Sequence, residues 1–183
     1  MPGGDDDRLI ERVAAGDRAA WGALVERHLA AVVGFAWYQL GDRAEAEDVA
    51  QETFVRLIGK IDGWRPGGPA LRTWLCRVAR NLCIDHRRAA RTVPLEDLPD
   101  RPGEAPDLEH GLDLRRSVRR ALDALPERQR TALVLVHYQG LTNQEAARML
   151  DASVEAVESL LARARRTLRR RLEASKSELL GVD

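Results

Sequence analysis

Four arginines within residues 71–90 are the side chains with the clearest chemical use. At 100° per residue they fall on one face of a helix, beside Ile84 and opposite an apolar stripe: Arg77, Arg80, Arg87 and Arg88. Trp64 lies in the loop before this stretch, and Trp74 lies near its start. Guanidinium groups can follow a DNA backbone and aromatic rings can receive unstacked bases, so the pattern suits single-stranded DNA. From these residues alone, a solvated basic face beside core tryptophans is the more common alternative.

A second polar face, on residues 42–61, is acidic. Apolar residues recur there with helical spacing: Ala46, Val49, Ala50, Phe54, Leu57, Ile58 and Ile61. The opposite face carries a different set: Glu45, Asp48, Gln51, Glu52 and Arg56. This face could dock on a basic partner. Acids in the first half of a helix also favour its dipole, however, and a solvated face is the simpler interpretation of the residues alone.

Residues 142–172 predict a helix-turn-helix. Thr142 and Glu145 fit a capping box, so a helix should begin there and run to Leu150. After a tight turn, Ser153 can cap a second helix. In such motifs the start of the second helix reaches base edges, and basic residues further along meet phosphates. The residues in those places are Glu155, Glu158, Ser159, Ala162 and Arg163, followed by Arg165, Arg166, Arg169 and Arg170.

No catalytic set is apparent. The sequence has no Gly-rich phosphate loop, no nucleophile elbow and no metalloprotease motif, so we predict neither an enzyme nor a cofactor. Cys76, Cys83 and His86 lie at i, i+7 and i+10 of one expected helix. Structural zinc sites usually contain close pairs of cysteines, and seven residues of helix are too long for a disulfide. We therefore expect no metal, and small, partly buried core residues.

Helices must position these side chains, and helices are the only regular secondary structure that the sequence predicts. No strand-like alternation occurs, and the periodicity is helical except at residues 91–113, which are rich in proline and acid. We predict an all-α protein of two small helical domains, residues 1–90 and 114–183, joined by this acidic Pro-rich linker. The expected helices cover residues 17–40, 42–61, 71–90, 113–125, 127–139 and 142–150, with a last helix after Ser153.

Composition excludes several classes of protein. The chain has 183 residues, with 29 Lys and Arg against 29 Asp and Glu, so its net charge of zero argues against a strongly basic, free-standing nucleic-acid binder. The longest apolar run, 29–38, is half the length of a spanning helix, about 20 residues. No secretion signal is visible. Reduced thiols in a cytoplasmic protein without membrane insertion are the simplest expectation.

Three stretches resemble bacterial RNA polymerase sigma factors of the extracytoplasmic-function group. Ala46–Leu57 resembles the helix that binds core polymerase, and Thr73–Arg88 resembles the helix that reads and melts the −10 promoter element. Ala121–Arg130 and Gly140–Ala147 together resemble the module that reads the −35 element. The resemblance covers about residues 8–173. The resemblance is specific because three motifs occur in the order and with the spacing found in this family.

The resemblance implies an alternative sigma factor that directs promoter recognition, with an anti-sigma factor as its regulator. The residues implied to bind core polymerase, at the clamp helices of its largest subunit, are Asp48, Gln51, Glu52 and Arg56. Those implied to face −10 DNA are Trp64, Trp74, Arg77, Arg80, Asn81, Asp85, Arg87 and Arg88. The loop 61–70 would hold a flipped base. The free-energy cost of unstacking that base must be offset by binding contacts. Those implied at the −35 element are Thr142, Ser153, Glu155, Glu158, Ser159, Arg163 and Arg166.

The recognition helix departs from the family. Members usually carry Gly-Thr-Val-Lys-Ser-Arg-Leu at its start, whereas Glu158 and Leu160 stand here in place of the two basic residues. Leu71 also replaces an aromatic residue of the family. Either the −35 preference is unusual, or contacts shift towards Arg163 and Arg166. Two further hypotheses stay open: a stand-alone helix-turn-helix regulator, and a sigma-like decoy that sequesters an anti-sigma factor.

Overall fold

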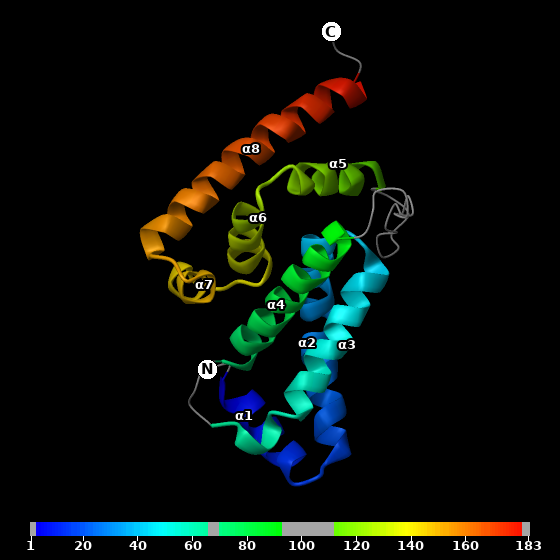
Figure 1. Ribbon diagram of the computed structural model, residues 1–183, viewed down its shortest axis with the longest axis vertical. Coiled ribbons are helices and arrows are strands. Elements are labelled where there is room, and N and C mark those ends of the chain that lie inside the picture. Colours follow the sequence, from blue (N-terminus) through cyan, green and yellow to red (C-terminus); the bar gives the residue numbers. More distant parts are fainter. Residues whose placement is uncertain (1–2, 66–69, 93–111, 181–183) are drawn as a thin grey trace. The chain divides into compact units, whose positions relative to one another are not determined.

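The computed structural model describes residues 3–65, 70–92 and 112–180, which contain helices and no strand (Figure 1). This confirms the predicted all-α class. The chain divides into two compact units, Met1–Pro102 and Gly103–Asp183. Of the predicted linker 91–113, residues 93–111 lie outside the described residues. Within the described part, no helix combines the length and the apolar character needed to cross a bilayer.

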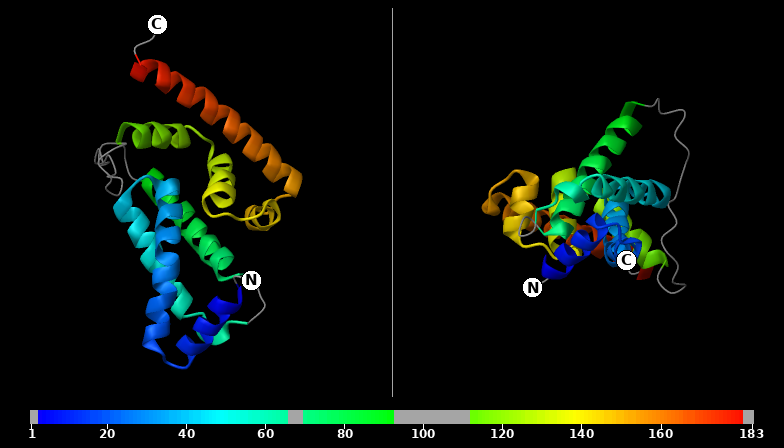
Figure 2. Two further views of the ribbon diagram at one scale, coloured as in Figure 1. Left: turned by 180° about the vertical axis from the view of Figure 1, so that it is seen from behind. Right: turned by 90° about the horizontal axis from the view of Figure 1, so that it is seen from below.

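Unit 1 is built around its longest helix. It contains α1 (Gly3–Ala14), α2 (Arg18–Leu40), α3 (Arg43–Ile58), the 3₁₀ turn η1 (Ile61–Gly63) and α4 (Leu71–Thr92). Helix α2 packs against α1, α3 and α4, and Figure 2 shows these helices side by side from two directions. Contact on several sides explains why α2 is apolar almost all round. The core of the unit includes Leu24, Phe35, Val49, Leu57, Leu71 and Leu75.

Helix α1 is an element that sequence reasoning did not assign. Ile10 is buried against the rest of unit 1, and Asp6 is also buried. The carboxylate of Asp6 accepts from the Arg27 guanidinium at 2.8 Å and lies 3.1 Å from Nε2 of His28. A buried carboxylate is stable only with such partners. The apolar spacing of Leu9, Ile10 and Val13 was the available signal, but glycines at the start of the chain obscured it.

Local capping chemistry sets both ends of α2 and the start of α3 where the sequence placed them, whereas α3 ends at Ile58, three residues earlier than predicted. Asp17 caps α2, accepting from the backbone N–H of Ala19 at 2.9 Å and of Ala20 at 3.1 Å. The Ala20 N–H and then the Arg12 guanidinium lower the pKa of this carboxyl. Gly41 ends α2 with a φ of 87°, which favours glycine, and Asp42 caps α3. The predicted break at residues 41 and 42 is confirmed.

Unit 2 contains α5 (Leu112–Asp123), α6 (Glu127–Leu133), the π-helical turn η3 (Val134–Tyr138), α7 (Asn143–Leu150) and α8 (Val154–Leu180). Helix α8 packs against α5, α6 and α7, and buries Val157, Leu161 and Ala164. The predicted helix 127–139 changes type after Leu133, where the Gln139 N–H bonds the Val134 carbonyl at 2.9 Å, five residues back. Spacing of apolar residues cannot reveal this change, because the segment stays helical.

Candidate functional site

The outward side of α3 is both acidic and apolar. Three of the four residues predicted to bind core polymerase lie there and are exposed: Asp48, Gln51 and Glu52. Val55 and Ile58 lie on the same side and are 55% and 53% exposed. We call these five residues the α3 outer face. Acidic side chains around two exposed aliphatic groups suit a partner helix with basic and apolar residues.

Two details of this face differ from the sequence interpretation. Ile58 was predicted in the core stripe, which was wrong: Leu57 takes the inward position, and the next residue is turned 100° away. Val55 was not considered, although its place between the polar residues and Ile58 was visible. Arg56 is exposed, and its Nε donates to Oε1 of Glu52 at 3.0 Å. Such a surface pair is worth about 0.3–0.5 kcal/mol, so it leaves Glu52 available to a partner.

Trp64 and Trp74 form an aromatic pair at the start of α4. Their ring centroids are 6.1 Å apart, and their planes meet at 81°, an edge-to-face contact. Trp64 follows η1, and its Nε1 donates to Oδ1 of Asp7 at 3.2 Å. Both rings are half-buried, so each keeps an accessible part. The predicted pocket loop 61–70 is described only in part, because residues 66–69 lie outside the described residues.

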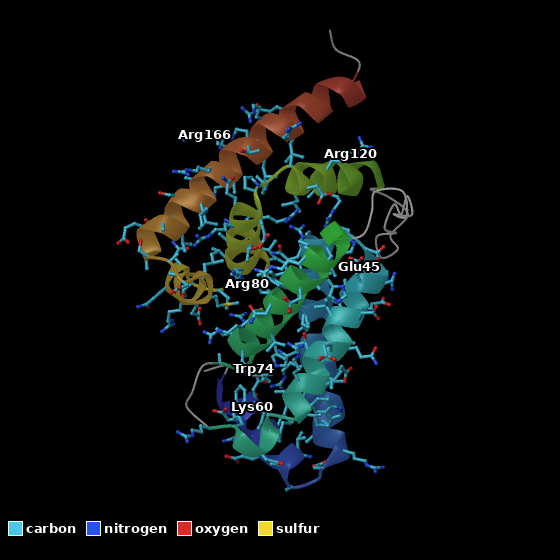
Figure 3. All side chains as sticks on the ribbon, viewed as in Figure 1. Glu45, Lys60, Trp74, Arg80, Arg120 and Arg166 are labelled. Atoms are coloured by element: carbon cyan, nitrogen blue, oxygen red, sulfur yellow. The ribbon has the colours of Figure 1, made fainter. Side chains whose placement is uncertain are left out.

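The residues of α4 predicted to face −10 DNA beyond Trp74 divide into two groups. Arg77, Asn81, Asp85 and Arg88 are exposed, whereas Arg80 and Arg87 are half-buried. The guanidinium of Arg87 donates to the backbone carbonyl of Gln39, near the end of α2. Carbonyls at a helix C-terminus have no partner within the helix and attract cations, so this contact joins α4 to α2. Figure 3 shows Trp74 at the start of α4 and Arg80 further along it. The sequence grouped all the arginines together because a helical wheel omits neighbouring helices.

The helix-turn-helix has the local structure that its sequence predicts. Thr142 Oγ1 accepts from the Glu145 N–H at 3.2 Å, while the Glu145 carboxylate accepts from the Thr142 N–H at 2.8 Å. The capping box is therefore confirmed. Asp151 makes the turn with a φ of 48°, a left-handed conformation that Asp tolerates better than most residues. Ser153 Oγ then caps α8, accepting from the Ala156 N–H at 3.1 Å.

The first turns of α8 present two carboxylates to solvent. Glu155 and Glu158 are both exposed. Hydrogen bonds from its own backbone N–H and then from the Ser153 hydroxyl lower the pKa of Glu155, so it is ionised at neutral pH. Asn143 Nδ2 donates to Oε1 of Glu158 at 3.4 Å, which connects the second helix of the motif to the first. The sequence showed the two acids but not this connection.

Beyond the acids, the exposed side of α8 becomes basic. Its exposed residues include Ser159, then Arg163, Arg165, Arg166, Arg169 and Arg170. Figure 3 shows Arg166 along this helix. Arg165 lies 3.0 Å from Nε2 of His137, a residue of η3. The surface of α8 thus has an acidic start and a long basic continuation, which suits contacts with phosphates there.

The cysteines of α4 are core residues. Cys76 and Cys83 are each 2% exposed and form no disulfide bond with one another. Burial raises the pKa of the Cys76 thiol from its ordinary 9.0 to about 12, against a smaller opposing effect of the Arg72 charge. Among the described residues, no cluster of three His, Cys, Asp or Glu side chains could hold a metal ion.

We expect the buried thiols to resist alkylation in the folded protein. At pH 8 a thiol with a pKa of about 12 is almost entirely protonated, and the thiol must also be exposed to react. Iodoacetamide at pH 8, followed by mass spectrometry, should label both cysteines rapidly in urea and at least about 100-fold more slowly in buffer. Rapid labelling of Cys76 in buffer would contradict its placement in the core.

Each unit thus presents a distinct candidate surface. Unit 1 has the α3 outer face, and also an aromatic pair at the start of α4 with exposed Arg77, Asn81 and Arg88 further along that helix. Unit 2 has a helix-turn-helix with a basic second helix. The fold and these surfaces define a two-unit helical protein whose second unit contains a helix-turn-helix.

Comparison with known proteins identifies the class. Residues 24–93 match the Sigma-70 region 2 family, and residues 115–168 match Sigma-70 region 4. The ECF RNA polymerase sigma factor SigE of Mycolicibacterium smegmatis is 35% identical over 175 residues, which cover 90% of this chain and 67% of that protein. The RNA polymerase sigma-H factor of Pseudomonas aeruginosa is 31% identical over 182 residues, covering 92% and 94% respectively.

Solved structures agree with these matches. CnrH, in complex with the cytosolic domain of CnrY, is 33% identical and aligns with a TM-score of 0.71 over 93% of this chain and 98% of that one. The sigma factor RpoE of Bartonella quintana, in complex with the anti-sigma factor NepR, shares the fold with a TM-score of 0.65 at 24% identity, over 81% and 94% of the two chains. Both modules are those of a sigma factor. The chain belongs to the extracytoplasmic-function family of RNA polymerase sigma factors, the alternative sigma factors of transcription initiation.

Proposed function

We propose that this chain joins core RNA polymerase through the α3 outer face, with the clamp helices of the largest subunit as the partner. The supporting observation is the joint exposure of Asp48, Gln51 and Glu52 beside Val55 and Ile58. Aliphatic side chains that are more than half exposed, as these two are, contribute favourable free energy when a partner covers them. The surrounding carboxylates would select a basic partner and orient it.

We further propose that α4 and the tryptophan pair contact −10 DNA. Arg77, Asn81 and Arg88 are exposed on one side of α4, where they can meet phosphates or base edges. Trp64 and Trp74 supply aromatic surface to a base that has left the stack. We expect fewer direct DNA contacts from the other three predicted residues of α4. Arg80 and Arg87 are half-buried, and Asp85 is acidic. Polymerase performs the chemistry, so the chain itself acts as no enzyme.

For the −35 element we propose contact through the start and outer side of α8. The direct readers would be Glu155, Glu158 and Ser159, with Arg163 and Arg166 on phosphates or guanine. A carboxylate accepts hydrogen bonds from the amino groups of cytosine or adenine and repels phosphate. Thr142 and Ser153 act at the helix ends, where each already caps a backbone N–H.

An anti-sigma factor is the proposed regulator. CnrH, which is 33% identical to this chain, forms a complex with the cytosolic domain of CnrY. A protein that covers the α3 outer face would block polymerase binding and keep this sigma factor inactive. Access to polymerase on chromosomal DNA also requires a cytoplasmic location, which we include in the proposal.

In vitro transcription tests the whole proposal. Purified chain would be added to sigma-free core polymerase and a library of genomic fragments from the source organism. We expect discrete transcripts that depend on the chain, and their start sites would give the promoter sequences. Core binding without any transcript would favour the decoy hypothesis. The absence of both core binding and transcripts would favour a stand-alone DNA-binding regulator.

The acids of α8 should weaken binding to DNA in general. In Glu158→Lys, a charge that repels phosphate becomes one that attracts it. We expect affinity for a random 30-base-pair duplex to rise about threefold to tenfold at low salt, with the salt slope steeper by about one. Fluorescence anisotropy at several salt concentrations measures both the affinity and the salt slope. The control variant, Glu26→Lys, makes the same charge change on α2 of unit 1. An equal gain in DNA affinity in both variants would refute the assignment of Glu158 to the DNA-facing surface.

A further inference from the structure

Helix α1 lies outside the motifs that carry the resemblance, yet it contacts the candidate −10 site. It packs on α2, on η1 and on α4. Asp7 in its first turns accepts a hydrogen bond from Trp64 Nε1 at 3.2 Å. The two residues are 57 positions apart, so the contact is a product of the tertiary fold.

We propose that α1 is a positioning element for promoter opening, in which Asp7 fixes the indole of Trp64 against Trp74. This inference rests on the proposed −10 function of unit 1. Asp7 itself would not contact DNA: a carboxylate beside phosphates would repel them, and here it is occupied by the indole N–H.

The neighbouring residue makes α1 rigid enough for this task. Asp6 is buried, and its carboxylate binds both Arg27 at 2.8 Å and His28 at 3.1 Å on α2. Ile10 adds a buried apolar contact one turn later. Because Asp6 holds the first turns of α1 to α2, the adjacent Asp7 offers an acceptor at a fixed place. Hydrogen bonds to a charged acceptor are stronger than those between neutral groups.

The orientation of Trp64 decides that of the aromatic pair. An edge-to-face contact such as that between Trp64 and Trp74 depends on the angle between the planes, here 81°. The indole could otherwise rotate about its two side-chain torsions. A ring that is held in advance costs less conformational entropy when a base binds, so the melted strand is captured more readily.

The test uses full-length chain and core polymerase on the strongest promoter fragment recovered from the genomic library. In Asp7→Ala we expect promoter opening, measured by permanganate reactivity of unpaired thymines, to fall about fivefold or more while core binding stays unchanged. Asp7→Asn keeps an acceptor oxygen and should stay within about twofold of the wild type. Asp5→Ala removes the same charge from an exposed neighbour in α1 and should have no effect.

A spectroscopic readout separates positioning from general destabilisation. In ¹⁵N-tryptophan-labelled chain, the Trp64 indole resonance should shift and exchange faster in Asp7→Ala, and return towards its wild-type place in Asp7→Asn. Trp64→Phe removes the donor but keeps an aromatic ring. Combined with Asp7→Ala it should lose no more opening than Trp64→Phe alone, since both changes break one contact.

Three results would overturn the inference: an unmoved Trp64 resonance in Asp7→Ala, a moved resonance with unchanged opening, or a fully additive double variant. A loss of core binding in Asp7→Ala would also count against it, because that would indicate damage to the whole unit. Failure of the wild-type chain to support any transcript would instead refute the proposed function, and that result precedes every comparison of variants.

Discussion

Asp48→Arg combined with Glu52→Arg is expected to lower the affinity for core RNA polymerase roughly 100-fold, which is about 2.7 kcal/mol of binding free energy. Both carboxylates lie on the α3 outer face, so the change places two positive charges against a partner selected for basic residues. The fold should be unaffected, since neither side chain is buried. Titration of core polymerase with fluorescently labelled chain measures the affinity.

A matched control separates the surface from the charge. Glu11→Arg with Glu26→Arg reverses two exposed acids on α1 and α2 and changes the net charge by the same amount. We expect it to bind core polymerase within about threefold of the wild type, as long-range attraction between exposed charges is screened by salt. Equal losses in the two double variants would refute docking through the α3 outer face.

Arg77→Glu combined with Arg88→Glu is expected to reduce promoter opening at least about tenfold while core binding is retained. Both arginines are exposed on α4, so their reversal replaces two attractions to the DNA backbone by two repulsions. Permanganate reactivity of the −10 thymines reports opening, and the polymerase titration described above reports assembly. Arg87 is a poor probe, because its guanidinium bonds the Gln39 carbonyl and its loss would also disturb the end of α2.

The comparison variant for this experiment is Arg18→Glu with Arg120→Glu. Both residues are exposed, and they lie on α2 and α5, helices to which no DNA contact is assigned (Figure 3 labels Arg120). The total charge changes equally in the two variants. If opening fell as far in the comparison variant, the loss would reflect general charge repulsion, and α4 would lose its assignment as the −10 reader.

Capping chemistry made much of the fold predictable. Helix ends are marked by residues that meet a local need of the backbone. The carboxylates of Asp17 and Asp42 accept hydrogen bonds from N–H groups of the first turn, and Gly41 adopts a left-handed conformation that favours glycine. The same holds for the capping box of Thr142 and Glu145. Such signals span three or four residues and need no knowledge of the tertiary fold.

The features of the structure that could not be predicted from the sequence depend on contacts between residues that are far apart in the chain. Helix α1 is stabilised by Asp6 with Arg27 and His28, some twenty residues away, and its local composition was ambiguous. The division of the α4 arginines follows from the position of Gln39 on another helix. Ile58 was wrongly assigned to the core, because the sequence pattern does not distinguish an apolar residue that packs inward from one at the edge of the core stripe that is exposed to solvent.

The π-helical turn Val134–Tyr138 determines where this chain can gain or lose a residue. Its bond from the Gln139 N–H to the Val134 carbonyl spans five residues, one more than an α-helix needs. A chain with one residue fewer in this turn could continue α6 as an ordinary helix up to Gly140. Between Gly140 and Thr142, by contrast, a deletion would displace the cap of α7. Where aligned relatives differ by one residue in this region, we therefore expect the gap inside Val134–Tyr138.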